Sequence, residues 1–101
     1  MKKISNTDFL EELYSIIKTR DQSKKKKSYT KLLLKGGKNI IAQKVSEESI
    51  ELIVDYLNGS KKRTIEEAAD LMYHFLVLLY SKKIIINDIR KELNKRRNVR
   101  R

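Results

Sequence analysis

Apolar residues recur every three or four positions along most of the chain, the spacing that places them on one face of an α-helix. This spacing predicts five helices: four over about residues 8–20, 29–35, 39–57 and 65–82, and a short fifth one that starts at residue 87. Apolar and polar residues do not alternate over enough positions to predict a sheet, since the run at 84–86 is too short. The predicted fold is all-α, a small bundle of about five helices.

Side chains that favour helix ends mark several boundaries. The predicted N-caps are Asn6 or Thr7 for the first helix, Ser28 for the second and Thr64 for the fourth. Gly36-Gly37 is predicted to end the second helix in a left-handed conformation. Thr64 and Glu67 also have the spacing of a capping box, which gives Glu67 an alternative role at the start of the fourth helix.

The third predicted helix has two apolar sides. One side is predicted to pack in the core and consists of Ile41, Val45, Leu52 and Tyr56. The other side consists of Ile50, Ile53, Val54 and Leu57. Two apolar sides need two packing partners, and we expect one of them to be a second copy of the chain, so that a homodimer completes the bundle.

Acidic residues are paired on the third and fourth predicted helices. Glu48 and Glu51 are one turn apart on the third helix, as are Glu67 and Asp70 on the fourth. Either pair alone is typical of a solvated surface, but antiparallel helices would bring the two pairs together. Carboxylates gathered out of water repel one another unless they are protonated or share a cation. Oxygen ligands suit Mg²⁺, with Mn²⁺ as an alternative, and the absence of Cys argues against zinc.

Two further residues lie on the acidic strips. Lys44 precedes the first pair, where it either neutralises Glu48 or Glu51 or reaches a substrate phosphate. His74 lies one turn beyond Asp70, and we interpret it as a buried histidine that supports Asp70 rather than as a metal ligand.

The formal net charge of +11 is unevenly distributed. Between residues 47 and 70, seven acids stand against three bases, whereas bases dominate elsewhere. An acidic site within a basic surface suits a metal-dependent enzyme with a polyphosphate substrate, although the excess lysine is equally consistent with a solvated surface. Lys24 to Lys27 is interpreted as a solvated run, with a mobile lid over an anionic substrate as the alternative.

The chain of 101 residues is predicted to be one domain, with flexible ends at 1–7 and 98–101. It has no Cys, no signal-peptide pattern and no apolar run near the roughly 18 residues of a membrane span. We therefore expect a cytoplasmic protein that has no membrane partner.

Several segments resemble one known family. They are Arg20, Ser28-Tyr29-Thr30, Gly36, Lys44-Val45, Glu47-Glu48, Glu51 and the stretch from Glu66 to His74. Over about residues 9–97 the chain resembles the phosphoribosyl-ATP pyrophosphohydrolase family of histidine biosynthesis, within the all-α NTP pyrophosphohydrolase (MazG-like) superfamily. Ser46 and Ser49 stand where the family usually has Gly and Ala, and both are small enough to keep the ligand geometry.

The resemblance implies Mg²⁺-dependent hydrolysis of 1-(5-phosphoribosyl)-ATP to 1-(5-phosphoribosyl)-AMP and pyrophosphate. It also implies that Glu48, Glu51, Glu67 and Asp70 bind the metal. We interpret Glu47 as the residue that orients or deprotonates the attacking water. The candidates for substrate contact are Arg20, Ser28, Tyr29, Thr30 and Lys44.

Two alternative functions are kept open. The first is a house-cleaning pyrophosphohydrolase with the same metal site, which acts on other nucleotides. The second is a basic helical protein that binds nucleic acid. The positive charge does not gather on a single recognition helix, which argues against the second alternative.

Overall fold

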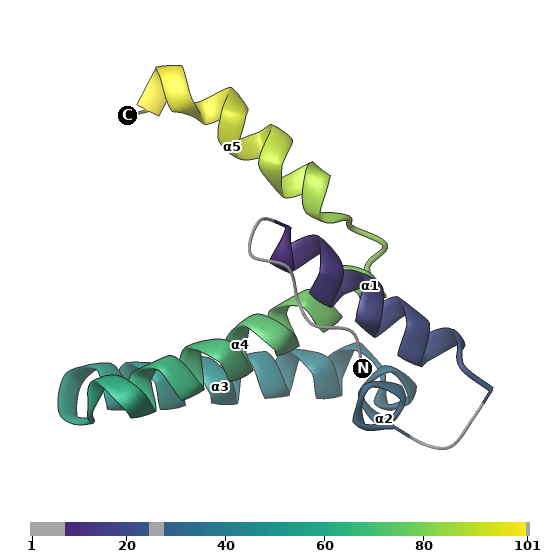
Figure 1. Cartoon of the computed structure of the whole chain (residues 1–101), viewed down its shortest axis with the longest axis horizontal. Helices are drawn as coiled ribbons and strands as arrows, with labels where there is room; N and C mark the ends of the chain where they lie inside the picture. The colour runs from purple at the N-terminus through teal and green to yellow at the C-terminus, as the bar shows by residue number, and fades with distance from the viewer. Residues whose placement is uncertain (1–7, 25–27, 101) are drawn as a thin grey trace.

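The computed structural model of the chain describes residues 8–24 and 28–100, with side chains up to residue 97. Five α-helices follow one another along this part of the chain (Figure 1). They are α1 (Phe9–Gln22), α2 (Tyr29–Gly36), α3 (Lys38–Asn58), α4 (Lys61–Ser81) and α5 (Ile86–Arg100). No strand occurs among these residues, so the predicted all-α fold of five helices is confirmed.

The helices α3 and α4 form a long antiparallel hairpin and make the most extensive contact between any two of the five helices (Figure 1). Both α1 and α2 pack against the part of the hairpin that lies away from its loop. α5 projects away from the hairpin and, among the described helices, contacts only α1. An ion pair between Arg90 and Glu11 joins these two helices.

The core lies where α1 and α2 meet the hairpin. Its buried apolar residues are Ile17, Leu33, Ile41, Leu76, Val77 and Leu79. The prediction that Ile41 packs in the core is confirmed, but the same prediction for Tyr56 is wrong, because its side chain is 73% exposed. Tyr56 lies in the last turn of α3, and the loop end of the hairpin extends beyond α1 and α2 (Figure 1).

Helix starts agree only in part with the predicted caps. Ser28 caps α2 as predicted, its Oγ accepting a hydrogen bond of 3.1 Å from the Lys31 amide. Thr64 does not cap α4, which begins earlier and is capped by Ser60, whose Oγ accepts from the Arg63 amide at 3.1 Å. The Thr64 hydroxyl donates to backbone carbonyls instead, so the predicted capping box with Glu67 does not form.

The end of α2 follows the prediction at one of its two glycines. Gly36 is the last residue of the helix, and Gly37 has a φ of 88° with its amide bonded to the Leu34 carbonyl. A positive φ strongly favours glycine, so this pair sets the sharp turn between α2 and α3. The predicted start of α1 at Asn6 or Thr7 lies outside the described residues.

The predictions about cellular location, chain ends and the lysine run stay predictions. None of the described helices combines the length and the apolar composition that a membrane span needs. A cytoplasmic location remains a prediction, as do the flexible ends. The solvated run or lid at Lys24 to Lys27 falls largely on residues 25–27, which lie outside the described residues.

Candidate functional site

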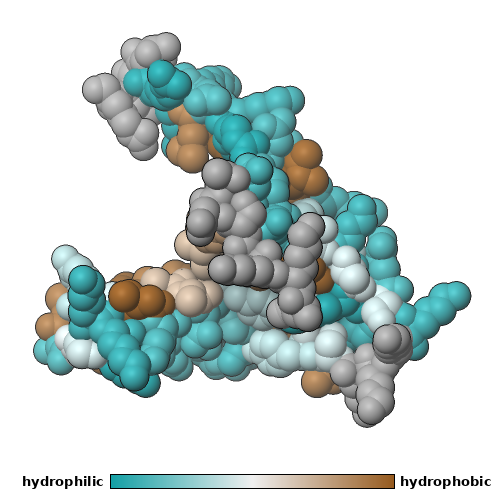
Figure 2. Space-filling view, viewed as in Figure 1, coloured by the Kyte–Doolittle hydropathy of each residue, from teal (hydrophilic) through white to brown (hydrophobic). Residues whose placement is uncertain are grey.

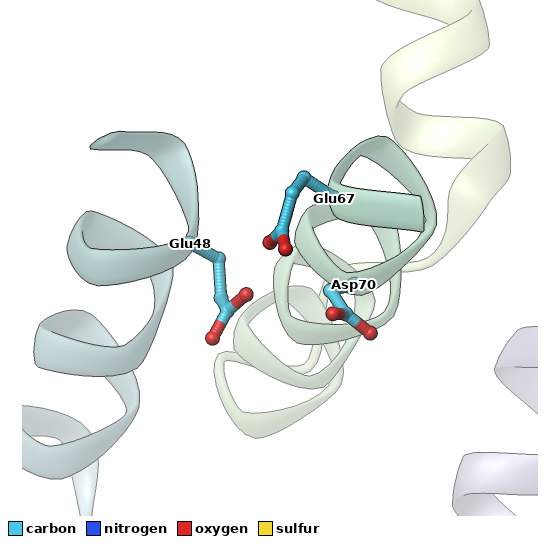
Figure 3. A group of neighbouring side chains, drawn as sticks. All are labelled: Glu48, Glu67 and Asp70. Carbon is cyan, nitrogen blue, oxygen red and sulfur yellow. The ribbon is translucent and has the colours of Figure 1, made fainter. Parts of the chain in front are cut away.

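Three of the predicted acidic residues meet between the hairpin helices. Glu48 from α3 points toward Glu67 and Asp70 from α4 (Figure 3). Each offers one carboxylate oxygen, and these atoms lie within 4.8 Å of one another. Glu48 and Glu67 are only 8% and 7% exposed, whereas Asp70 is open to solvent. We call these three residues the acidic cluster.

Each of the two buried carboxylates has one oxygen near a cation and one oxygen without a partner. Glu48 Oε2 lies 3.7 Å from Lys44 Nζ, and Glu67 Oε2 lies 3.5 Å from Arg63 Nη2. The remaining oxygens, Glu48 Oε1 and Glu67 Oε1, are buried and accept no hydrogen bond. A buried polar atom without a partner is costly and calls for an explanation. A hard divalent cation fits this set of oxygen donors.

Glu51 lies beside the acidic cluster rather than within it. Burial raises the pKa of Glu67, and so does Glu51, to which a protonated Glu67 can donate a hydrogen bond and which repels its charged form; repulsion from Asp70 and Glu48 follows. Glu51 itself is exposed. The other three predicted acids therefore all act on Glu67, but only Glu48 and Asp70 form the compact group with it.

Glu47 is not one of the residues of the acidic cluster. Its side chain is exposed, and its Oε2 accepts a hydrogen bond of 3.0 Å from Gln43 Nε2. Lys44 Nζ lies 3.5 Å from its other oxygen. The Gln43 hydrogen bond lowers the pKa of Glu47, and the Lys44 charge lowers it further.

His74 is buried behind the acidic cluster. Its Nδ1 lies 2.7 Å from the backbone carbonyl oxygen of Asp70, and its Nε2 lies 2.7 Å from the Tyr29 hydroxyl. A carbonyl only accepts, so Nδ1 is the donor. His74 thus contacts the backbone of Asp70 and is not part of the compact carboxylate group, and its supporting role stays a prediction.

The predicted substrate residues of α2 have different environments. Thr30 is 0% exposed and its hydroxyl pairs with that of Tyr73, so this side chain fastens α2 to α4. The Ser28 oxygen is used in the helix cap. Tyr29 is 48% exposed and reaches His74. Arg20 lies in the last turn of α1, where it is partly buried.

Sequence reasoning missed two residues around the site. Arg63 lies within 3.7 Å of Asp55, Glu66 and Glu67. Its position three and four residues before Glu66 and Glu67 is a usable signal, but the predicted fourth helix begins at about residue 65 and leaves Arg63 outside it. Tyr73 lies in the stretch from Glu66 to His74 that carries the resemblance, but no spacing in the sequence predicts its pairing with Thr30, which is 43 positions away.

The fold and the site define a class of protein, an all-α protein in which carboxylates from two antiparallel helices gather into one group. Residues 10–97 match the family described as phosphoribosyl-ATP pyrophosphohydrolase, and the chain belongs to this family. The predicted resemblance is therefore confirmed.

Named relatives agree with this assignment. A phosphoribosyl-ATP pyrophosphatase of Clostridium novyi is 43% identical over 94 residues, covering 93% of this chain and 86% of the relative. One from Sulfolobus acidocaldarius is 46% identical, covering 86% of this chain and 92% of the relative. The histidine biosynthesis bifunctional protein HisIE of Thermotoga maritima is 40% identical; the match covers 85% of this chain and 44% of that protein.

Proposed function

We propose that the chain hydrolyses 1-(5-phosphoribosyl)-ATP to 1-(5-phosphoribosyl)-AMP and pyrophosphate, and that the acidic cluster with Glu51 binds the required Mg²⁺. Family membership supports the reaction. The observation that carries the site is the pair of buried oxygens, Glu48 Oε1 and Glu67 Oε1, that accept no hydrogen bond. In the reaction, water attacks phosphorus and the anhydride bond between the α and β phosphates breaks.

The residues of the site would have different roles in catalysis. Glu48, Glu67 and Asp70 would hold the cation, with Glu51 beside them. When bound, Mg²⁺ would neutralise phosphate oxygens and lower the pKa of a water molecule. Lys44 adds a point charge next to Glu48, and a lysine ammonium has three donors with which to bind a phosphate.

Glu47 suits the orientation of water better than its deprotonation. Its lowered pKa makes it a weaker base, and its exposed carboxylate accepts a hydrogen bond from Gln43. We therefore expect Glu47→Gln to lower turnover only moderately while Mg²⁺ binding survives. Loss of Mg²⁺ binding in this variant would make Glu47 a ligand instead.

The activity is tested by pyrophosphate release with Mg²⁺, comparing phosphoribosyl-ATP with the four ordinary nucleoside triphosphates. Glu67→Gln is expected to abolish hydrolysis, since it removes a buried charge from the proposed metal site. Glu66→Gln is the matched control, because Glu66 is the exposed neighbour on the same helix. Preference for ordinary triphosphates would move the chain to the house-cleaning alternative. Equal activity of the two variants would refute the proposed site.

Cation binding is tested separately by thermal unfolding. A ligand at one hundred times its Kd stabilises the folded state by about 2.7 kcal/mol. The wild-type protein should gain this stabilisation with saturating Mg²⁺, and Glu67→Gln should not. Salt-dependent binding of nucleic acid without Mg²⁺, together with no response to Mg²⁺, would favour the basic nucleic-acid-binding alternative.

We also propose that a second copy of the chain covers the exposed apolar stripe of α3. Ile50, Ile53, Val54 and Leu57 follow the spacing of one helix face and are 53–68% exposed. Figure 2 shows apolar surface on the side of the hairpin that faces α5 and on α5 itself. The stripe contains no charge, so two copies can meet there without burying like charges.

The dimer is tested by measuring molar mass over a range of protein concentrations. Ile53→Glu places a charge in the stripe and should shift the protein to monomers. Tyr56→Glu is the control, because Tyr56 is 73% exposed on another side of the same helix. A monomeric wild-type protein at high concentration would refute the proposal.

A further inference from the structure

Arg63 is the cation that lies against the buried carboxylate of Glu67. Its Nη2 lies 3.5 Å from Glu67 Oε2, one turn along α4. The same nitrogen lies 3.7 Å from Asp55 Oδ2 on α3, and Nη1 lies 3.7 Å from Glu66 Oε1. One guanidinium is therefore shared among three acids, of which only Glu67 belongs to the acidic cluster.

The three contacts of the Arg63 guanidinium are all longer than a strong hydrogen bond. Charge-assisted N–H···O hydrogen bonds are about 2.7–2.9 Å long, whereas these contacts measure 3.5–3.7 Å. A guanidinium has several N–H donors in a fixed plane, and the Arg63 side chain is 58% exposed. Its donors are therefore available to an anion that arrives from solvent.

Arg63 has partners that hold it near the acidic cluster independently of Glu67. Asp55 lies on the facing helix, and its side chain is only 18% exposed. The backbone carbonyl of Asp55 accepts hydrogen bonds from the Thr64 hydroxyl at 3.1 Å and from the Gly59 amide at 2.8 Å, so its position is fixed. Asp55 and Glu66 would therefore retain the guanidinium if its contact with Glu67 were lost.

Arg63 and a divalent cation would compete for the carboxylate of Glu67. Two positive charges near one carboxylate repel each other, and the repulsion is only weakly screened where the carboxylate is buried. The contact between Arg63 and Glu67 should therefore weaken when the proposed Mg²⁺ is bound. The guanidinium would then lie beside the metal site with free donors, and its planar fork matches two oxygens of a phosphate group.

We propose that Arg63 is the counter-ion of Glu67 in the metal-free protein and a substrate-binding residue once Mg²⁺ is bound, when it donates to a phosphate group of the substrate. The inference rests on the proposed function, because it takes the acidic cluster to bind Mg²⁺ and the ligand to be a phosphate ester or anhydride. It requires that loss of Arg63 strengthens Mg²⁺ binding and weakens phosphate binding. A residue that only held α3 against α4 would not change the two affinities in opposite directions.

The experiment compares Arg63→Gln and Arg63→Lys with the wild-type protein at one fixed ionic strength. Calorimetry measures the Kd of Mg²⁺ alone and the Kd of inorganic pyrophosphate with saturating Mg²⁺. Pyrophosphate release measures kcat and KM for phosphoribosyl-ATP, and circular dichroism checks that each variant is folded.

Lys62→Gln is the matched control for the loss of one positive charge. Lys62 is exposed in the same first turn of α4 and, among the residues that the structure describes, forms no ion pair with an acid. This variant therefore has the same net charge as Arg63→Gln and leaves the contact between Arg63 and Glu67 in place.

Arg63→Gln is expected to lower the Kd of Mg²⁺ by about fivefold, because it removes a positive charge next to the site. It should raise KM and the Kd of pyrophosphate by about tenfold, since a charge-assisted hydrogen bond is lost. Arg63→Lys keeps the charge but loses the fork, so its Mg²⁺ affinity should stay within about twofold of the wild type while its pyrophosphate Kd rises. Lys62→Gln should change each Kd by less than about twofold, because solvent and salt screen an exposed charge.

The inference has clear contrary outcomes. An unchanged or weaker Mg²⁺ affinity in Arg63→Gln would overturn it, as would an unchanged pyrophosphate Kd. Equal effects of Lys62→Gln and Arg63→Gln would also overturn it, because net charge alone would then explain the result. If Arg63→Gln does not fold, a pyrophosphate Kd in Arg63→Lys equal to that of the wild type overturns the inference, and a higher one supports it.

Failure of the proposed function has a different signature. If the wild-type protein does not hydrolyse phosphoribosyl-ATP, that reaction is wrong, but the two Kd values still test Arg63, and opposite changes in Arg63→Gln would support the inference. If the wild-type protein hydrolyses the substrate and Arg63→Gln shows no opposite changes, the function stands and the inference fails. A wild-type protein that binds no Mg²⁺ would refute both the proposed metal site and the inference.

Discussion

The end of α4 contains a lysine in a backbone conformation that favours glycine. Lys83 has a φ of 62°. Its amide bonds to the Tyr80 carbonyl at 3.0 Å, and the next amide, of Ile84, bonds to the Leu79 carbonyl at 2.9 Å. These two bonds and the left-handed residue make a Schellman motif, in which the position of Lys83 is usually glycine. We predict that Lys83→Gly stabilises the protein.

The size of the stabilisation expected for Lys83→Gly follows from two opposing effects. A left-handed conformation costs a non-glycine residue about 1–2 kcal/mol, and glycine removes this cost. Glycine also makes the unfolded chain more flexible, which lowers the stability of the folded state by about 0.4–1 kcal/mol. The net gain for Lys83→Gly is therefore about 1 kcal/mol. Lys82 precedes it with an ordinary φ of −94°, so Lys82→Gly has only the unfavourable effect.

The effect of glycine on the unfolded chain is common to both variants. The difference in their stability therefore measures the cost of holding a non-glycine residue in the left-handed conformation at position 83. We expect Lys83→Gly to exceed Lys82→Gly in the free energy of unfolding by about 1–2 kcal/mol. Urea unfolding followed by circular dichroism measures this difference at one fixed protein concentration. For a domain of this size each kcal/mol corresponds to about 4–8 °C in Tm. Equal stability of the two variants would refute the reasoning.

Three other substitutions test the packing and one hydrogen bond. Leu76→Ala should lower the free energy of unfolding by about 2–5 kcal/mol in urea titrations, because Leu76 is fully buried in the core. Thr30→Val should cost about 1–3 kcal/mol by the same measurement, since it leaves the Tyr73 hydroxyl without its partner. The hydrogen bond to Asp21, with burial, raises the pKa of Tyr80 to about 12. The contribution of this hydrogen bond to the stability of the folded protein should therefore be lost as the pH rises from 10 toward 12. In Tyr80→Phe, urea unfolding over this pH range should show a smaller alkaline loss.

The helices were largely predictable because their apolar spacing reflects packing against one core. The ends of the helices were less predictable from the sequence. Residues 61–63 are all basic, and positive charge at a helix start opposes the helix dipole, so the sequence favoured Thr64 over Ser60 as the cap. The helix α5 was predicted to be short because its apolar spacing stops after Leu93, although no Gly or Pro ends it before Arg100.

The carboxylate pairs of the site were predictable from spacing, because residues three apart lie on one helix face. Which of two adjacent acids turns inward depends on the packing of α3 on α4, and this selects Glu48 over Glu47 and Glu67 over Glu66 as the buried ones. The contact between Tyr29 and His74 joins residues 45 positions apart. Such a contact depends on how α2 docks on the hairpin, and no local spacing in the sequence contains that information.

The acidic cluster lies within the most extensive helix contact of the fold, so its charge should affect the stability of the whole protein. Three carboxylates share two nearby side-chain cations, Lys44 and Arg63, and the group keeps a net negative charge. The pKa of Glu67 is raised, which means that the folded state holds a proton there more tightly than the unfolded chain does. In the presence of a chelator, stability should therefore fall as the pH rises above the ordinary value of 4.5.

Glu67→Gln tests this coupling because it removes the charge and nearly preserves the shape of the side chain. With a chelator at pH 7, the variant should have a higher Tm than the wild-type protein, and its Tm should depend less on pH between 4 and 8. With saturating Mg²⁺ the order should reverse, since only the wild-type protein gains from the bound cation. A variant that is less stable than the wild-type protein even with the chelator would mean that the carboxylate of Glu67 contributes more through its ion pair with Arg63 than it costs through burial and repulsion. The cluster would then be a structural ion-pair network, and its two unpaired oxygens would no longer be evidence for a cation site.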